Sequence, residues 1–396
     1  MNSIKLSALA AVLAALASPG VALAQEGPHV GGSIAGSASA HDNIFAGPNN
    51  EVSDTVWGVS GRVNWGSKDD MGSFGVWGSV DLERYADNSD EDADDFGVGL
   101  HGSRKFSGGG SLSFDASHEM NTEDRRDRMA RRDTNERVEY STNSAHASLG
   151  HQFSGVLVTG SLSVSAFDYD DARIRTTLVA VDQDHRDRTS FGQSIKASFP
   201  ESGGASWFVS ASRSEIDYDL APPASLHQRD SESASVSGGM DFTARPDLTG
   251  SISAGWTSRS FDHPAFDDVS TLAIDANVKW EAGPDTTWRF YADRSIQETT
   301  LANSSSYVSM TLGGSVNHSF GNRLGVRLSL QKEWNEHEGI DRDDDVWEAG
   351  VGVTAQLTSS VEAALTYTMT SEDSDGVFAS PGYDVGVAAF SLTASF

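Results

Sequence analysis

The sequence predicts an all-β fold, a closed, antiparallel, up-and-down transmembrane β-barrel of about 18 strands (about 16 to 18). Apolar and polar residues alternate in many segments of roughly nine to eleven residues, which is the length of a tilted membrane strand. Short turns alternate with long charged connections along the chain, as they do in the barrels of bacterial outer membranes. The first residues also have the pattern of an export signal.

Residues 1–24 have the composition of a Sec signal peptide. A lysine at position 5 precedes an apolar stretch over residues 6–17, and Ala22-Leu23-Ala24 fits the small-x-small cleavage rule. The apolar stretch is shorter than the roughly 20 residues that a transmembrane helix needs. We therefore predict that residues 1–24 are removed and that residues 25–396 form one barrel domain. A retained N-terminal helix is the alternative.

Composition and charge exclude several classes of protein. The formal net charge is −29, whereas nucleic-acid binding requires clustered lysine and arginine, so we expect no nucleic-acid partner. The chain has no cysteine, so disulfides and cysteine-based metal or nucleophile chemistry are excluded. Disorder is the competing interpretation of an acidic, serine-rich chain, but 9 tryptophans and 18 phenylalanines at regular intervals argue against it.

Each alternating segment has one apolar face and one polar face. The segment over residues 361–369 is typical, and its apolar positions are Val361, Ala363, Leu365, Tyr367 and Met369. Because no apolar run is long enough for a helical span, we expect the apolar faces to meet lipid and the polar faces to line a lumen.

The connections differ in length from one rim of the barrel to the other. The short turns are residues 67–70, 108–109, 154–155, 201–204, 245–247, 283–285, 321–322 and 359–360. The long, charged loops are residues 42–54, 87–95, 121–137, 168–188, 217–230, 262–268, 335–345 and 371–383. Short turns typically face the periplasm and long loops the outside, so an even strand count puts both chain ends on the periplasmic side.

Aromatic residues flank the short turns and predict a girdle at the periplasmic headgroup level. The alternation also predicts which charged side chains line the lumen. They are Arg62, Asp81, Glu83, Asp115, Lys196, Asp275, Arg289, Asp293, Arg327 and Glu348. A solvated wall with lateral ion pairs is one interpretation of these residues, and rings of charge that select solutes are the other.

One loop is rich in arginine although the chain is acidic. Residues 121–137 contain Arg125, Arg126, Arg128, Arg131 and Arg132, followed by Arg137. One hypothesis folds this loop into the mouth of the barrel as a cationic constriction for anionic solutes or an acidic polymer. The alternative is a short exposed helix whose arginines are neutralised by the acidic residues of the same loop.

Neither metal nor catalytic chemistry is expected. The acidic residues of loop 87–95 do not have the spacing of an EF-hand, so we expect a mobile acidic loop and no bound metal. No G-x-S-x-G motif with a partnered histidine occurs. Histidines lie near aspartates in several loops, but such neighbours are expected by accident in an acidic chain. We predict no catalytic residue and no cofactor.

The chain ends in an alternating strand that closes with Phe396. A terminal aromatic residue of this kind resembles the signal by which the barrel-assembly machinery recognises its clients. We therefore expect that machinery as a partner, together with outer-membrane lipid and lipopolysaccharide.

The first predicted hairpin carries a more specific resemblance. The residues Ala38-Ser39-Ala40-His41-Asp42-Asn43-Ile44-Phe45 and then Asp54-Thr55-Val56-Trp57-Gly58-Val59-Ser60 resemble the start of a family of outer-membrane β-barrel porins. His41 stands where that family often has an aromatic residue or Asp, and the proline usual after the start of its second strand is missing.

The resemblance implies a large single-chain barrel in the Gram-negative outer membrane. It also implies a link of some relatives to exopolysaccharide secretion, with a periplasmic polysaccharide-export protein as partner. The sequence therefore predicts an outer-membrane pore that passes polysaccharide or polar solutes. A general small-solute porin and a non-transporting surface or structural barrel are the alternatives.

Overall fold

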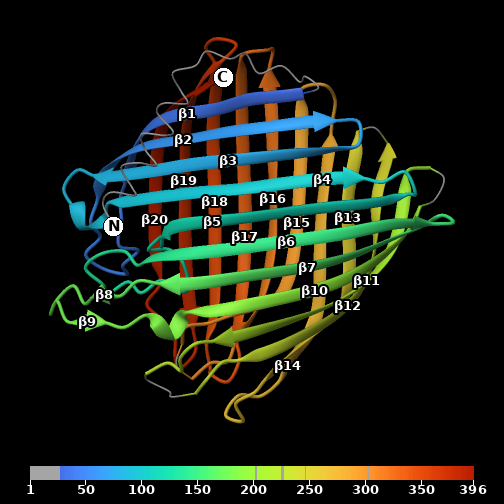
Figure 1. Cartoon of the computed structure of the whole chain (residues 1–396). Coiled ribbons are helices and arrows are strands. Elements are labelled where there is room, and N and C mark those ends of the chain that lie inside the picture. Colours follow the sequence, from blue (N-terminus) through green and yellow to red (C-terminus); the bar gives the residue numbers. More distant parts are fainter. Residues whose placement is uncertain (1–26, 201–202, 224–226, 246, 302) are drawn as a thin grey trace.

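The alternating segments form the wall of a closed barrel in the computed structural model, which describes residues 27–396 except 201–202, 224–226, 246 and 302. The predicted signal peptide, residues 1–24, lies outside the described residues. Figure 1 shows the barrel from the side, with strands crossing at a steep tilt on its near and far walls.

The barrel wall is an 18-stranded sheet, as the sequence predicts. Its strands are β1 (Gly27–His41), β2 (Asp54–Asp69), β3 (Gly72–Tyr85), β4 (Ala93–Lys105), β5 (Gly110–Thr122), β6 (Glu139–Phe153), β7 (Val156–Tyr169), β10 (Arg188–Pro200), β11 (Ala205–Tyr218), β12 (Ser231–Arg245), β13 (Leu248–Phe261), β14 (Val269–Glu281), β15 (Thr286–Gln297), β16 (Tyr307–Phe320), β17 (Leu324–His337), β18 (Asp343–Gln356), β19 (Val361–Asp375) and β20 (Tyr383–Ser395). Every strand pairs antiparallel with its neighbours in chain order.

The seam of the barrel joins the first strand to the last. β1 pairs antiparallel with β20 from Ser33 to His41, so no sheet edge is left unpaired. The backbone groups of Gly32 and Phe396 exchange two hydrogen bonds of 2.9 and 3.0 Å. Gly32 is required there, because a Cβ at this position would lie 2.6 Å from Cζ of the Phe396 ring. Closure is necessary because an unpaired edge in hydrocarbon would cost several kcal/mol per backbone group.

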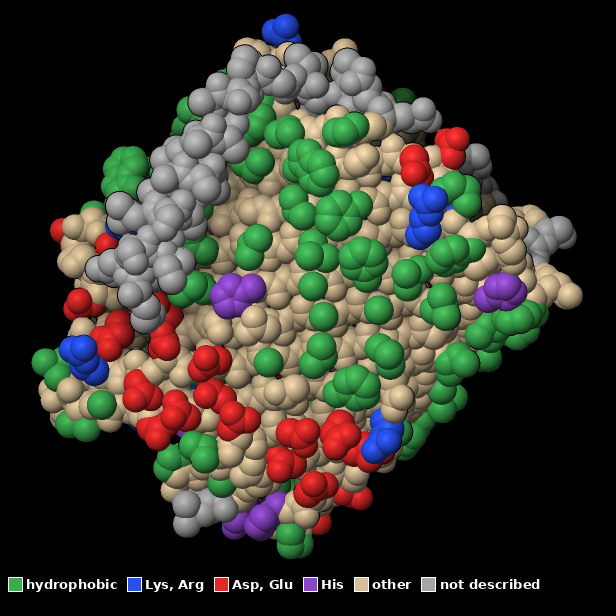
Figure 2. All heavy atoms as spheres, in the orientation of Figure 1, with side chains coloured by type: hydrophobic (Ala, Val, Ile, Leu, Met, Phe, Trp, Pro, Cys, Tyr) green, Lys and Arg blue, Asp and Glu red, His purple; other side chains and the backbone are tan. Residues whose placement is uncertain are grey.

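The two faces of the wall differ as the alternation predicts. Leu149, Val236 and Leu365 point outward and are 61%, 64% and 59% exposed. Figure 2 shows apolar side chains scattered over the outer wall and acidic side chains gathered along its left and lower edge. The aromatic residues predicted to flank the short turns also point outward; Trp65, Phe153 and Phe320 are exposed.

The long loops contain the little structure that is not in the wall. The loop after β3 holds the 3₁₀ turn η1 (Ser89–Glu91), and the loop after β7 holds the hairpin β8–β9 (Ala172–Arg173 and Ala180–Val181) and the 3₁₀ turn η2 (Asp184–Arg186). The connection between β15 and β16, residues 298–306, is also long, although it is not among the predicted long loops. No helix among the described residues is long and apolar enough to cross a membrane.

Candidate functional site

The arginine-rich loop between β5 and β6, residues 123–138, crosses the lumen. The Arg128 guanidinium lies 3.1 Å from Glu333 of β17 and 3.6 Å from Asp344 of β18. Arg132 lies 3.5 Å from Glu372 of β19, and its guanidinium stacks 4.4 Å above the ring of Tyr383 of β20. In the strand order β17 lies on the opposite side of the barrel from β5, so these contacts join opposite walls.

Two buried ion pairs fix the root of this loop. Arg125 is 4% exposed, and it donates to both carboxylate oxygens of Glu91 at 2.7 and 2.9 Å and to Thr134 Oγ1 at 2.7 Å. Arg186 of η2 pairs in the same way with the buried Glu123. Charged hydrogen bonds to both oxygens fix direction as well as distance, so the loop is held in one orientation.

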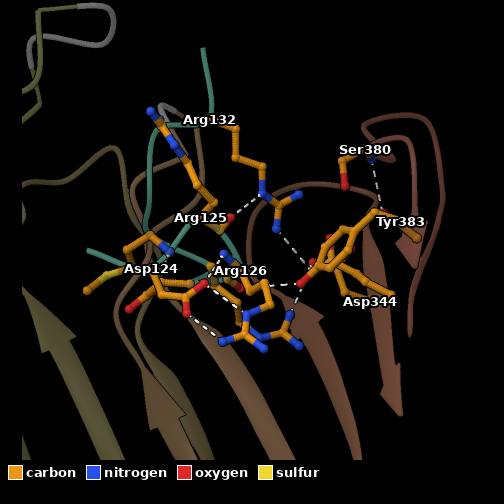
Figure 3. A network of polar contacts seen from close by, with 12 residues as sticks. Asp124, Arg125, Arg126, Arg132, Asp344, Ser380 and Tyr383 are labelled. Atoms are coloured by element: carbon orange, nitrogen blue, oxygen red, sulfur yellow. Dashed lines mark hydrogen bonds and ion pairs between the residues drawn. The ribbon is translucent and has the colours of Figure 1, made fainter. Parts of the chain in front are cut away.

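The conformation of this loop bears on the predicted alternative of a short exposed helix. No helix forms within residues 123–138, so the predicted alternative of an exposed helix is wrong. The ion pairs expected within the loop do occur, between Arg126 and Asp124 at 2.6 Å and between Arg131 and Asp133 at 2.7 Å. Figure 3 shows the Asp124 carboxylate directed at Arg126, while Arg132 reaches toward Tyr383.

The ion pair of Arg126 with Asp124 shifts the pKa values of both side chains. The hydrogen bond from Arg126 raises the pKa of the guanidinium above its usual value, although burial opposes that shift. Burial alone would raise the pKa of Asp124, but its contacts with Arg126 outweigh burial, so the pKa of Asp124 is lowered. Both side chains therefore stay charged at every pH at which the barrel would work.

The acidic loop after β3 also differs from the expectation. A mobile acidic loop was predicted for residues 87–95, but Glu91 is 1% exposed beneath Arg125. The backbone amide of Tyr85 donates to Asp92 at 2.8 Å. The expectation failed because Glu91 pairs with an arginine from a different loop. The sequence does not show that the two loops lie side by side.

A ring of inward tyrosines, which is not among the predicted features, surrounds the crossing loop. Six of the eight tyrosines lie at the long-loop ends of their strands and on the lumen face; they are Tyr85, Tyr140, Tyr169, Tyr218, Tyr307 and Tyr383. Arginines stack on four of them: Arg137 on Tyr85, Arg186 and Arg188 on Tyr169, Arg188 on Tyr218, and Arg132 on Tyr383. The sequence does contain a signal for this ring of tyrosines, because tryptophan and phenylalanine flank the short turns whereas tyrosine lies next to the long loops.

Cavities among the described residues lie against the crossing loop. The outer one, of 450 Å³, is lined by the five arginines Arg128, Arg131, Arg132, Arg186 and Arg342 and the three carboxylates Asp133, Asp344 and Glu372. The inner one, of 640 Å³, has the opposite balance, with Arg126, Arg128 and Arg188 against Asp124, Asp127, Glu298, Glu333, Glu348 and Glu372. The third, of 620 Å³, lies against β1 to β5. From the outer cavity to the inner one, the lining therefore changes from an excess of arginines to an excess of carboxylates.

The wall residues predicted to line the lumen separate into groups. Arg62, Asp81 and Glu83 line the cavity against β1 to β5, and Glu348 lines the inner cavity. Lys196 pairs with Asp241 at 3.0 Å. The register sets Asp275 directly opposite Asp293, and Lys279 opposite Arg289. Asp115 lies opposite His146, and Arg327 lies opposite Asn317.

One polar array on this wall has the order of groups found in serine hydrolases. Ser148 Oγ lies 3.2 Å from His146 Nε2, and His146 Nδ1 lies 3.3 Å from Asp115 Oδ1. Ser148 is flanked by Ser113 and Ser161 on the adjoining strands. Backbone amides in an antiparallel ladder are already paired, so those of the adjoining strands are not free to donate to an oxyanion. We therefore assign these residues to the polar wall.

The fold, the polar lumen and the loop that crosses it define the class of protein: a bacterial outer-membrane β-barrel of the porin type. The chain belongs to the family described as "Putative beta-barrel porin 2", whose model matches residues 29–394. This match confirms the resemblance predicted from the first hairpin. No curated protein matches the chain.

Solved structures share the barrel at low sequence identity. The siderophore receptor PirA from Acinetobacter baumannii has a TM-score of 0.51 and 7% identity, covering 94% of this chain and 81% of that one. The outer membrane protein opdK from Pseudomonas aeruginosa has a TM-score of 0.46 and 10% identity, covering 93% of this chain and 99% of that one. At 7% identity the likeness to PirA shows the fold alone.

Proposed function

We propose that this barrel passes small polar solutes across the outer membrane and that loop 123–138 is its constriction. The observation that carries the proposal is the contact of Arg128 and Arg132 with Glu333 and Glu372 on the far wall. A loop anchored at both sides of a wide barrel narrows the aqueous path, which an 18-stranded wall would otherwise leave open. The mixed charges of the remaining cavities favour hydrated polar solutes over apolar ones.

The test is conductance in planar bilayers. The purified wild-type barrel should give steady channels, and the double variant Arg128→Gln/Arg132→Gln should conduct at least about twofold more because the loop loses its hold on the far wall. The matched control is Arg126→Gln/Arg131→Gln, which removes the same charge from side chains whose ion pairs among the described residues lie within the loop. A wild-type protein without channels would overturn the pore, and equal conductance of the two double variants would overturn the constriction.

Passage of a polysaccharide is the alternative that the family resemblance implies. The anchored loop opposes it, because a polymer strand would pass only after the contacts of Arg128 and Arg132 were broken. A polysaccharide exporter predicts that deletion of the protein abolishes surface polymer and leaves small-solute permeability unchanged. A non-transporting barrel predicts no change in either.

A further inference from the structure

We propose that the inner wall below the constriction carries an oxyanion-binding site, formed by Arg289 of β15, Asn317 of β16 and Arg327 of β17. We call these three residues the wall site. It would bind solutes that bear a phosphate or carboxylate group. The inference deepens the proposed function by naming a solute class, and it rests on that function for access of the solute to the lumen.

The strand register brings the three side chains together. Arg289 lies opposite Ser315 on β16, and Asn317, two residues further along the same face of β16, lies opposite Arg327. Two strand spacings and two residues separate the arginines, so their Cα atoms are about 12 Å apart. Arginine side chains of ordinary length can reach a common anion across that distance, with the Asn317 amide between them.

The guanidinium groups of the wall site and the Asn317 amide nitrogen have no acceptor among the residues that the structure describes. Over the part of the chain that the structure describes, neither Arg289 nor Arg327 has an ion pair or a hydrogen bond. The Nδ2 atom of Asn317 is buried, and it too has no partner there. Other lumen cations are satisfied: Arg62 donates to Asn64 at 3.2 Å, and Lys196 pairs with Asp241. Both guanidinium groups are exposed to the lumen and free to take a solute as partner. The buried Nδ2 of Asn317 would normally have a partner, so the cluster points to an acceptor supplied by a ligand.

The neighbouring charges strengthen the case. Lys279 lies directly opposite Arg289, and like charges in that position repel each other. Glu281 pairs with Lys279 at 2.5 Å, which leaves Arg289 unneutralised. The nearest acidic residue on β15, Asp293, is four residues away, about 13 Å along the strand. The chain has 57 acidic residues and 28 lysines and arginines, so a shortage of carboxylates does not explain why these two guanidinium groups lack a partner among the described residues.

The geometry of the donors indicates the chemical class of the ligand. Guanidinium groups bind carboxylates and phosphates through paired N–H donors, and a single oxyanion can accept from several groups at once. Phosphate and carboxylate share this chemistry, so the two are separated by experiment. The position of the wall site shows which side of the barrel it serves, because Arg327 is three residues from the start of β17 at the short-turn rim. The wall site therefore faces solutes on the periplasmic side of the constriction.

The test is isothermal titration calorimetry of the purified barrel in detergent at low ionic strength, with sodium pyrophosphate and sodium citrate as probes. Low salt is needed because ions screen exposed charges. Wild-type protein should bind at least one probe, and Arg289→Gln/Arg327→Gln should bind it at least tenfold more weakly. The control Arg62→Gln/Lys196→Gln removes the same charge from other parts of the lumen wall and should change the affinity less than twofold.

The outcomes separate the site from the pore. Absence of binding by the wild type, or equal weakening in both double variants, would overturn the wall site even if the barrel conducts. Binding that is lost only in Arg289→Gln/Arg327→Gln supports the site even if the barrel shows no channels, in which case the proposed pore fails. The stronger probe identifies phosphate or carboxylate as the preferred group. Heat-modifiable migration in gels checks that both variants are folded.

Discussion

Two sets of arginines in this barrel have opposite surroundings. In the crossing loop Arg125, Arg128 and Arg132 are each paired with a carboxylate from another part of the chain. On the wall below, Arg289 and Arg327 point into the same lumen without any partner among the residues that the structure describes. The loop is the denser run of positive charge in the sequence, yet its charge is already satisfied within the fold.

The contrast shows what pairing does to a charge. A guanidinium held by a buried carboxylate fixes the loop, and releasing it for a solute would leave that carboxylate buried and unpaired, which is costly. An unpaired guanidinium in an aqueous lumen can exchange water for a solute oxyanion at little cost. We therefore assign a structural role to the loop arginines and a role in solute binding to the wall arginines. Three experiments test this contrast, from the largest expected effect to the smallest.

The largest effect is expected at the root of the loop. Arg125→Ala leaves Glu91 buried and unpaired, which typically costs about 3–5 kcal/mol, so the loop should open locally. Arg131→Ala removes a pair whose side chains are 40% and 58% exposed, and such pairs contribute about 0–1 kcal/mol. Hydrogen exchange of peptides from residues 123–138 measures both. Equal exchange in the two variants would contradict the structural role of Arg125.

A smaller effect of opposite sign is expected on the wall. Arg289→Glu replaces the repulsion with Lys279 by attraction, so the barrel should gain roughly 0.2–1 kcal/mol. The urea midpoint of the detergent-solubilised protein should rise. Arg62→Glu is the comparison, because Arg62 stacks 4.2 Å above the ring of Trp77 and should lose stability on substitution. A midpoint that falls in Arg289→Glu would mean that the Arg289 charge is satisfied in a way the contacts do not show.

The smallest effect concerns pH at the outer rim. Burial raises the pKa of Asp187 to about 6, and the backbone amide of Tyr169 donates to its carboxylate at 2.7 Å. The folded protein binds this proton more tightly than the unfolded chain does. Protonation of Asp187 therefore stabilises the folded state fully below about pH 4, and this contribution is lost as the pH rises through 6. Asp187→Asn should remove this dependence. Thermal midpoints of wild type and Asp187→Asn at pH 5 and pH 7.5 measure this dependence. The role of Asp187 would be refuted if the variant showed the same difference between the two pH values as the wild type.

The sequence was sufficient for the wall because alternation is a local property. Val361, Leu365 and Met369 reveal the lipid face of one strand without any knowledge of its neighbours, and turn residues mark where each strand ends. The family resemblance rested on equally local residues, Asp42 to Phe45. The loop of residues 298–306 was missed because it lacks the dense charge that marked the others.

The site was only partly within reach. Parity placed Arg289 and Arg327 on the lumen face, but their common level depends on the register of three strands, which no single segment encodes. The pairing of Glu91 with Arg125 and of Glu333 with Arg128 joins residues far apart in the chain. From the residues alone, an exposed helix was the favoured interpretation of the loop arginines.

The sequence by itself determined a barrel of about 18 strands, its lipid and lumen faces and its two unlike rims, because each follows from spacing along the chain. Only the tertiary structure decided which charges meet across the lumen and which remain free. Electrostatic partners are chosen by distance in space, and in a closed barrel that distance is set by register and closure.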